Sequence, residues 1–361
     1  MNKRKKKETV PQALPQPKIG KIDFNAFNSF ILKRLGKKNS SVLVPPLTGI
    51  DAGVIDIGNG KVLIIAEDPI FSIPRQPLEM FGWYTVHIGA SDVAVMGVKP
   101  GYMTYTLLMP PETSDEEFRT IVDSIHMTAV ELEIAIVGGH TGYYPGFAAP
   151  MIGGITVFAV ADKDRYVTPA GARPGDDVIL TKGPAIETAG ILSVLREKEL
   201  LEKHPQERVE KAKSLCTQMT VVKDALVAME AGGVSAMHDA TEGGVIGGLF
   251  EIAYASRVGM DIDESLFIYP DEVRMVCEAF TIDPVAAIAE GSLLLTTRPA
   301  HSAKVIKKLK EVSIEASVIG RVTENTGKRI MKRFDGTHVP LRIPPQDPFW
   351  PAFFAGLVSE D

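Results

Sequence analysis

The chain has 361 residues, of which 45% are hydrophobic and 23% are charged. This length predicts two domains, and this composition excludes disordered, collagenous and disulfide-scaffold proteins. The 39 basic and 45 acidic residues give a net charge of −6, although residues 3–7 are all basic. Because the remainder is acidic, it lacks the broad basic face that nucleic-acid binding needs, and we expect no nucleic-acid partner.

The sequence predicts a cytoplasmic protein without membrane association. Its two cysteines, Cys216 and Cys277, form no CxxC pair, which fits a reducing compartment. The basic N-terminus continues into Pro- and Gln-rich sequence rather than an apolar stretch, so no signal peptide is predicted. Residues 134–161 contain no Asp, Glu, Lys or Arg, but six glycines and two prolines interrupt them. A membrane helix would not tolerate these breaks, so a strand–loop–strand is predicted there.

Helices and strands are predicted to alternate in the first half of the chain. Residues 1–17 are predicted to form a flexible segment, because the stretch is rich in proline and charge. An amphipathic helix is predicted from Phe24 to Leu35, ended by Gly36. The elements predicted next are a strand at 61–66, a helix at 78–98, a strand at 103–108, a helix at 115–133 and buried strands at 134–137 and 155–161.

A charged, Pro- and Gly-rich stretch at 162–177 predicts a junction between two domains. The domains would span 18–165 and 172–345, with a C-terminal tail at 346–361. After the junction, the sequence predicts strands at 178–181, 236–238, 292–296 and 316–319, and helices at 185–195, 207–231, 243–255 and 303–312. Because strands and helices alternate in both halves, the predicted fold class is α/β or α+β.

Carboxylates in apolar surroundings are the strongest functional signal, because several catalytic motifs are absent. The sequence has no GxxxxGK[ST] phosphate loop, no HExxH, no GxSxG and no GxGxxG after a strand. Four aspartates lie in or at the ends of apolar runs: Asp51, Asp68, Asp92 and Asp239. A buried carboxylate is costly unless a cation meets it, and converging carboxylates would hold hydrated Mg²⁺ near phosphates. Taken singly, each aspartate fits a helix cap or a turn equally well. Glu67 is expected to point away from Asp68, on the other face of its strand.

The motifs around these aspartates resemble the aminoimidazole-ribonucleotide (AIR) synthase superfamily. They are Gly49-Ile-Asp-Ala-Gly-Val-Ile55, strand-terminal Asp68, Ser91-Asp-Val-Ala-Val-Met-Gly-Val-Lys-Pro100, Gly138-Gly-His-Thr141 and Asp239-Ala-Thr-Glu-Gly-Gly244. The superfamily includes AIR synthase, formylglycinamidine synthase, thiamine-monophosphate kinase, selenophosphate synthetase and the hydrogenase maturation protein HypE. The Asp239 motif looks most like HypE and the AIR-synthase-related proteins.

The resemblance implies that the N-terminal domains of a homodimer share a β-barrel, beside C-terminal α/β domains, with ATP in the cleft between these parts. It implies a metal site for Mg²⁺ and the ATP phosphates at Asp51, Asp68 and Asp92. It implies catalytic roles for Asp92 and Asp239. The residues implied near the nucleotide, phosphate or substrate are Gly138, Gly139, His140, Thr141, Thr241, Gly243 and Gly244. Family members transfer the γ-phosphate of ATP to an oxygen or to selenide, which requires neutralisation of the phosphoryl charge.

Three residues depart from the family pattern. Ile50 stands at the first position of an aspartate pair, His140 replaces an acidic residue and Glu242 replaces a frequently basic one. These changes remove oxygen donors for Mg²⁺ and a positive charge for phosphate. The glycine- or lysine-containing phosphate segment of the family has only a weak counterpart, Lys18-Ile-Gly-Lys21.

Two hypotheses for the function follow. The first is an ATP- and Mg²⁺-dependent enzyme that activates an oxygen of an unidentified small-molecule or protein-borne substrate by phosphoryl transfer. The second is a catalytically degenerate nucleotide- or metabolite-binding module that acts as a regulator or maturation partner. HypE carries its substrate on a C-terminal cysteine, whereas the last cysteine here is Cys277, so self-carbamoyl dehydration is not expected. Selenophosphate synthesis is not expected either, because no cysteine lies near the N-terminal segment.

Overall fold

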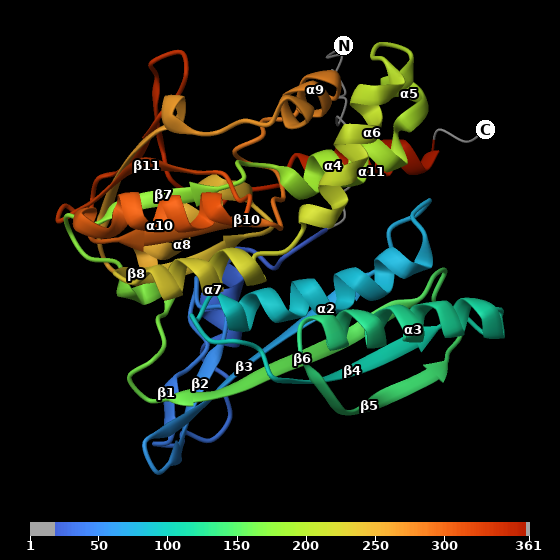
Figure 1. Ribbon diagram of the computed structural model, residues 1–361, viewed down its shortest axis with the longest axis horizontal. Helices are drawn as coiled ribbons and strands as arrows, with labels where there is room; N and C mark the ends of the chain where they lie inside the picture. The colour runs from blue at the N-terminus through green and yellow to red at the C-terminus, as the bar shows by residue number, and fades with distance from the viewer. Residues whose placement is uncertain (1–18, 359–361) are drawn as a thin grey trace, which may run out of the picture.

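The computed structural model describes residues 19–358 and contains two β-sheets with helices packed against them (Figure 1). The flexible segment predicted at 1–17, the basic residues 3–7 and the last three residues lie outside the described residues. Mixed strands and helices in both halves confirm the predicted α/β class. No helix within residues 19–358 is both long enough and apolar enough to cross a membrane.

The first sheet has six strands in the order β1-β2-β3-β6-β4-β5. Neighbouring strands are antiparallel except β4 and β5, which are parallel. The strands are β1 (Val42–Val44), β2 (Gly53–Gly58), β3 (Lys61–Phe71), β4 (Tyr102–Met109), β5 (Ala135–Tyr143) and β6 (Met151–Asp162).

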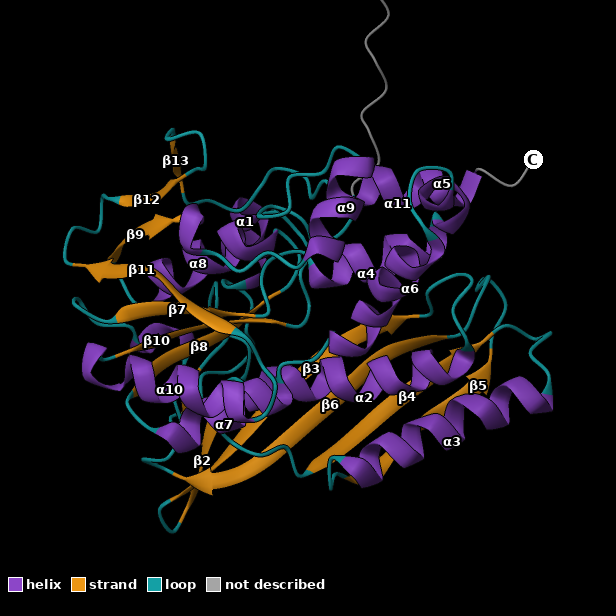
Figure 2. Cartoon of the chain, turned by 45° about the horizontal axis from the view of Figure 1, so that its top comes forward, coloured by secondary structure: helices purple, strands orange, loops and turns teal. Residues whose placement is uncertain are grey.

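Helices α2 (Leu78–Ala94) and α3 (Asp115–Glu131) cover one face of this sheet (Figure 2). Helix α3 begins at the predicted residue because Ser114 and Glu117 form a capping box. Helix α2 is apolar without a polar face, and most of it is buried, because α7 (Val222–Ala231), which belongs to the second half of the chain, packs against it as well. Helix α2 is therefore shared by both halves of the molecule.

The opposite face of the six-stranded sheet is open in the single chain. Tyr102 and Val160 are 43% and 50% exposed, and the rings of Tyr102 and Phe158 stack on each other. The prediction of a buried strand at 134–137 is wrong, because β5 is the edge strand and Val137 is 55% exposed. An apolar run predicts burial of a strand, but it does not distinguish burial within the chain from burial against another copy.

The second sheet has seven strands in the order β13-β12-β9-β11-β7-β10-β8. Only β12 and β9 pair in parallel. The strands are β7 (Asp177–Thr181), β8 (Val234–Ala240), β9 (Gly259–Asp263), β10 (Ser292–Thr297), β11 (Ala316–Thr323), β12 (Arg329–Lys332) and β13 (His338–Pro340).

Helices bury both faces of this second sheet. Along β10, Leu293 and Leu295 join the core beneath α7 (Val222–Ala231) and α10 (Pro299–Glu311), whereas Leu294 joins the core beneath α8 (Gly244–Ala255). This alternation follows from the two-residue period of a strand. It also explains why every residue of β7 and β10 is buried, because a strand that is covered on both faces has no exposed side.

The remaining helices gather at the end of the molecule where the chain terminates (Figure 1). They are α4 (Ile186–Leu195), α5 (Glu197–Leu201), α6 (Gln206–Ser214), α9 (Asp271–Ala279) and α11 (Phe349–Val358). Helix α11 lies within the stretch predicted as a tail, and its Phe349 is buried.

Two predicted helices differ from the structure. The helix predicted at 207–231 is divided into α6, a 3-10 helix (Leu215–Gln218) and α7. Ser214 and Thr217 donate side-chain hydrogen bonds to backbone carbonyls at this break, which competes with helical bonding. The helix predicted from Phe24 becomes a short α1 (Phe24–Ala26) and a π-helix (Phe27–Ile31), because the Asn28 amide takes the Phe24 carbonyl.

Candidate functional site

The four aspartates singled out by the sequence come together between the two sheets. Asp51 precedes β2, Asp68 lies on β3, Asp92 lies near the end of α2, and Asp239 lies on β8, the edge strand of the second sheet. Burial raises the pKa of Asp92 well above its ordinary value, and the charges of Asp68, Asp239 and Asp51 raise it further. Burial and repulsion from Asp51 raise the pKa of Asp239 to about 7. These carboxylates therefore form one electrostatic unit.

His238 fixes one side of this carboxylate cluster. Its Nδ1 lies 2.7 Å from Asp51 Oδ1, and its Nε2 lies 3.0 Å from Glu251 Oε2 on α8. Burial opposes the charged imidazolium, but Asp51 and Glu251 outweigh that effect and raise the pKa of His238 well above its ordinary value. Potential ligand atoms of Asp51, His238 and Asp239 lie within 4.8 Å of one another. Because an imidazolium has no lone pair to donate, the two carboxylates are the candidate metal ligands and His238 positions Asp51.

Several carboxylate oxygens of the cluster lack a hydrogen-bond partner. Asp51 Oδ2, Asp239 Oδ1 and Glu290 Oε1 are buried without one in the part of the chain that the structure describes. The side chains of Asp68 and Asp92 interact directly with each other, which requires a proton or a cation between them. Buried, unpaired anionic oxygens are unfavourable, and hard oxygen donors are what Mg²⁺ prefers. The donor set therefore fits a divalent cation.

Lys21 is a site residue that the sequence analysis did not select. Its Nζ donates to Thr241 Oγ1 at 2.7 Å, and its backbone N–H donates to Glu242 Oε2 at 2.8 Å. Four carboxylates act on the ammonium: Glu251, Asp68, Asp239 and Asp92. Burial of the charge lowers the pKa of Lys21, but these carboxylates outweigh it and the pKa lies above its ordinary value. Although the residue as a whole is exposed, its ammonium thus partly balances the cluster.

Gly20 allows the N-terminal segment to approach so closely. Its φ is +87°, and a Cβ at this position would lie 1.8 Å from Glu242 Oε1. Glu242, the residue that departs from the family's basic position, therefore binds the chain's own backbone. The weak match at Lys18-Ile-Gly-Lys21 was the only sequence signal for this contact.

The glycine pair at the start of α8 is engaged within the chain. The N–H of Gly243 donates to Asp347 Oδ2 at 2.8 Å, and the N–H of Gly244 donates to the Thr241 carbonyl at 3.0 Å. A carboxylate at a helix N-terminus is stabilised by the helix dipole, so Asp347 stabilises the start of α8.

The residues 138–141 are not brought to the cluster within one chain. They lie on β5, and the strand register places Gly139 beside Tyr105, Tyr105 beside Ile155 and Ile155 beside Asp68. With strands about 4.8 Å apart, Gly139 is therefore about 14 Å from Asp68 across the sheet. His140 Nε2 instead lies 2.6 Å from the Tyr144 hydroxyl.

Neighbouring acids confirm one expectation and extend the site. Glu67 accepts a hydrogen bond from Thr156 at 3.0 Å on the other face of the sheet from the cluster, as the strand alternation predicted.

Two further buried acids, Glu187 and Glu290, lie within the second sheet's half and are 8% and 2% exposed. Both stand in apolar sequence, the signal that identified Asp92, and that signal would have found them too.

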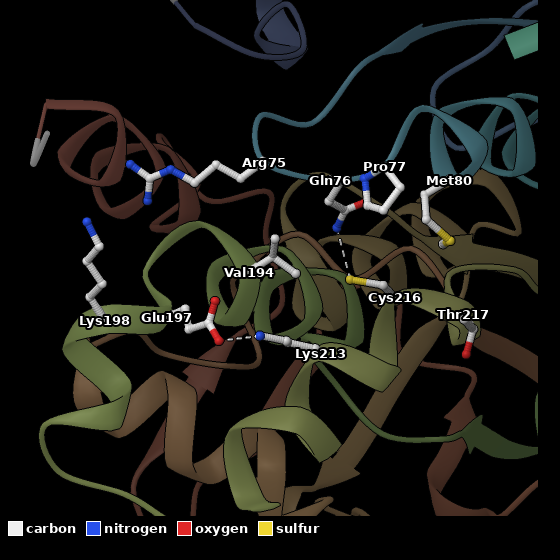
Figure 3. Close-up of a pocket in the computed structure, with 10 residues that line it drawn as sticks. All are labelled: Arg75, Gln76, Pro77, Met80, Val194, Glu197, Lys198, Lys213, Cys216 and Thr217. Carbon is white, nitrogen blue, oxygen red and sulfur yellow. Dashed lines mark hydrogen bonds and ion pairs between the residues drawn. The ribbon is translucent and has the colours of Figure 1, made fainter. Parts of the chain in front are cut away.

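A separate cavity of about 410 Å³ lies between the start of α2 and the helices α4–α6 (Figure 3). Gln76 Nε2 donates to Cys216 Sγ at 3.1 Å inside it, and Lys213 pairs with Glu197. Burial raises the pKa of the Cys216 thiol, which disfavours a nucleophilic thiolate. Because none of its lining residues belongs to the carboxylate cluster, we do not assign the chemistry to this cavity.

The fold and the cluster define a two-sheet α/β protein with an acidic centre between its sheets. The chain belongs to the AIR synthase-related family: residues 49–170 match the AIR synthase related protein N-terminal domain, and residues 173–332 match its C-terminal domain. This confirms the resemblance found in the sequence.

Individual relatives cover most of the chain. The selenide, water dikinase of Methanococcus maripaludis is 30% identical over 293 residues, covering 77% of this chain and 84% of that protein. The carbamoyl dehydratase HypE of Cupriavidus necator is 29% identical over 287 residues, covering 77% and 78%. The crystal structure of hydrogenase maturation protein HypE in complex with ATP is 21% identical, with a TM-score of 0.67 over 90% of this chain and 95% of that one. This last similarity shows a common fold.

Proposed function

We propose that the protein is an ATP- and Mg²⁺-dependent enzyme that activates an oxygen of its substrate by phosphoryl transfer. The observation that carries this proposal is the convergence of four aspartates between the sheets, with Asp51 Oδ2 and Asp239 Oδ1 buried and unpartnered among the residues described. Membership of the AIR synthase-related family supports it, as does the ATP bound to the HypE structure of the same fold.

Different residues of the cluster would bind the metal ion and the phosphate groups. Asp51, Asp68 and Asp92 would hold Mg²⁺, with His238 keeping Asp51 in position. Bound there, Mg²⁺ neutralises charge on the transferred phosphoryl group. Lys21, oriented by Thr241, presents an ammonium to phosphate oxygens, and Asp239 faces them from the second sheet.

The direct test is calorimetric titration of the full-length protein with ATP, with and without Mg²⁺. We expect binding at submillimolar nucleotide with Mg²⁺ and its loss when EDTA is added, because the cluster repels a free triphosphate. Absence of binding at millimolar Mg²⁺–ATP would contradict the proposal. Binding without ADP formation, across candidate acceptors, would favour the non-catalytic binding module instead.

We also propose that two chains pair through the open face of the six-stranded sheet. That face carries exposed Tyr102 and Val160, and an apolar patch beside an unpaired edge strand is typical of a protein interface. Light scattering should therefore give a mass of twice 39.1 kDa. Val160→Glu should give a monomer, because it buries an unpaired charge in the interface.

Val130→Glu is the matched control for this prediction. Val130 lies on α3 and is 57% exposed on the other side of the sheet. The same substitution there should leave the mass unchanged. A monomeric wild-type protein, or a dimer that survives Val160→Glu, would show that this face is not the interface.

A further inference from the structure

We propose that the exposed face of helix α11 is the docking site for the Pro-rich N-terminal segment of the same chain, residues 10–18. This docking is independent of the proposed phosphoryl transfer. Helix α11 has the sequence FWPAFFAGLV, which contains only apolar and aromatic residues and one glycine. A helix that is hydrophobic all round is normally buried all round. Its composition therefore predicts that α11 is covered on every side.

The described chain covers only one side of α11. Phe349 and Ala352 are buried on the side where α11 packs against α4. The residues of the opposite side are exposed: Pro351, Phe354, Ala355 and Leu357. The exposed fractions of Phe354 and Leu357 are 39% and 40%, and the ring of Trp350 stacks on Phe354 with 6.1 Å between their centroids. The uncovered side is thus a continuous aromatic and aliphatic surface.

The described chain begins next to the first turn of α11. Gly20 lies so close to Glu242 that a Cβ would be 1.8 Å from Glu242 Oε1. The following residue, Gly243, donates its N–H to Asp347 Oδ2 at 2.8 Å. The other carboxylate oxygen of Asp347 accepts the N–H of Phe349 at 2.9 Å. The preceding N-terminal segment is therefore attached beside the start of α11.

The N-terminal segment is long enough to cover the helix. Helix α11 has 10 residues and is about 15 Å long. Residues 10–18 span about 28 Å when extended at about 3.1 Å per residue. Because the segment is attached beside α11, its effective concentration there is roughly millimolar, and the fixed φ of proline lowers the entropy lost on ordering. Docking within the chain therefore requires little intrinsic affinity.

The sequence of the segment matches an aromatic surface. It reads VPQALPQPK from residue 10 to residue 18. A polyproline II helix has three residues per turn, so in this conformation Pro11, Leu14 and Pro17 share one edge, whereas Gln12 and Gln16 lie on other edges. Pro-rich segments in this conformation dock on aromatic-lined surfaces. The apolar edge of the segment therefore fits the uncovered side of α11.

Charged residues follow the two apolar stretches in a complementary order. Residues 3–7, beyond the Pro-rich stretch, are all basic, and residues 360 and 361, beyond α11, are both acidic. The C-terminus of a helix also carries a partial negative charge that attracts cations. A segment that runs antiparallel to α11 from its point of attachment brings the basic residues to this acidic end. This order of charges and the short tether favour the chain's own segment over a second copy.

The test is a distance measurement by double electron–electron resonance on the full-length protein, with spin labels at Gln12→Cys and Val130→Cys. The two native cysteines are buried, and Val130 is 57% exposed on α3. Mixing with excess unlabelled protein restricts the signal to distances within one chain. We expect a single narrow distance, because an undocked segment spreads residue 12 over about 15 Å around its point of attachment.

Leu14→Asp and Phe354→Asp should each broaden this distance distribution at least about 2-fold, because each places a charge in the apolar contact. The matched controls are Gln16→Asp, on another edge of the segment, and Phe334→Asp, which changes a 55% exposed aromatic residue between β12 and β13. Both controls should keep the distribution narrow. Leu14→Asp changes no described residue, so it tests the docking even if Phe354→Asp fails to fold, which thermal melts would show.

A disulfide provides a second measurement. Under air oxidation, Leu14→Cys and Phe354→Cys should form a cross-link within one chain, at least about 10-fold faster than the control pair Leu14→Cys and Phe334→Cys. A broad distance distribution without Asp substitutions, or a narrow one that survives Leu14→Asp, would overturn the proposal. Equal cross-linking of the two pairs would overturn it as well. A covalent dimer would assign the α11 face to a second copy and would also overturn docking within the chain.

Discussion

Asp68→Asn should reduce ATP turnover at least about 100-fold, whereas Glu67→Gln should leave it within about 3-fold of wild type. The two acids are adjacent on β3 but point to opposite faces of the sheet. Asp68 acts on Lys21 and Asp92 within the cluster, whereas Glu67 accepts a hydrogen bond from Thr156 on the other face. The measurement is ADP release by the full-length protein at saturating Mg²⁺.

This pair of variants separates chemistry from folding. Asparagine and glutamine keep the shape of the acids and remove only the charge, so both variants should fold. Asp68→Asn should also raise the metal-free Tm, because it removes one of several mutually repelling carboxylates. Similar turnover in the two variants would show that the cluster is not the site of phosphoryl transfer. Because Glu67 lies on the proposed interface, light scattering should verify that the Glu67→Gln variant has the same mass in solution as the wild type.

The metal-free protein should lose stability as the pH rises from about 4 to above 8, which is the reverse of ordinary acid denaturation. Burial raises the pKa of Glu187 to about 8, and burial with repulsion from Asp51 raises the pKa of Asp239 to about 7. Between their ordinary values of 4.5 and 3.8 and these raised values, the folded chain binds more protons than the unfolded chain. The contribution of these two groups to the free energy of unfolding is therefore fully present at low pH and is lost as the pH rises through their raised pKa values.

The free energy of unfolding should decrease by several kcal/mol over this pH range, since a shift of one pKa unit between the folded and unfolded states is worth about 1.4 kcal/mol. His238 acts in the same direction, because its raised pKa means that a stabilising charge is lost on deprotonation. Urea unfolding in EDTA at pH 5, 6, 7 and 8 measures the trend, and Glu187→Gln should flatten it. Mg²⁺ should restore stability at pH 8 by binding only the folded state. Stability that increases from pH 5 to 8 in EDTA would contradict the predicted protonation states.

The sequence predicted those features that local patterns determine. Strands at 61–66, 103–108, 178–181 and 292–296 and helices at 115–133 and 243–255 are present, because each has a clear period or a cap. The four aspartates were recognisable because a carboxylate in apolar sequence is exceptional wherever it occurs.

Features that depend on contacts between distant parts of the chain were not predicted. Lys21 reaches Thr241 across 220 positions of sequence, and no local pattern records such a contact. Glu290 and Glu187 carried the same signal as the aspartates but belonged to no quoted motif. The exposure of β5 was missed because an apolar strand at a sheet edge has the same composition as one in a core.

The position of α2 between the two sheets means that a relative movement of the sheets would change the distance between the carboxylates of the two halves. Asp68 and Asp92 belong to the β3–α2 layer, whereas Asp239 lies on β8 of the second sheet and Glu290 in the turn before β10. A rotation of one sheet against the other would therefore widen or narrow the gap between two pairs of like charges. Repulsion within the empty cluster favours the wider gap and a bridging ion the narrower one, so metal occupancy and interdomain angle are thermodynamically linked in this architecture.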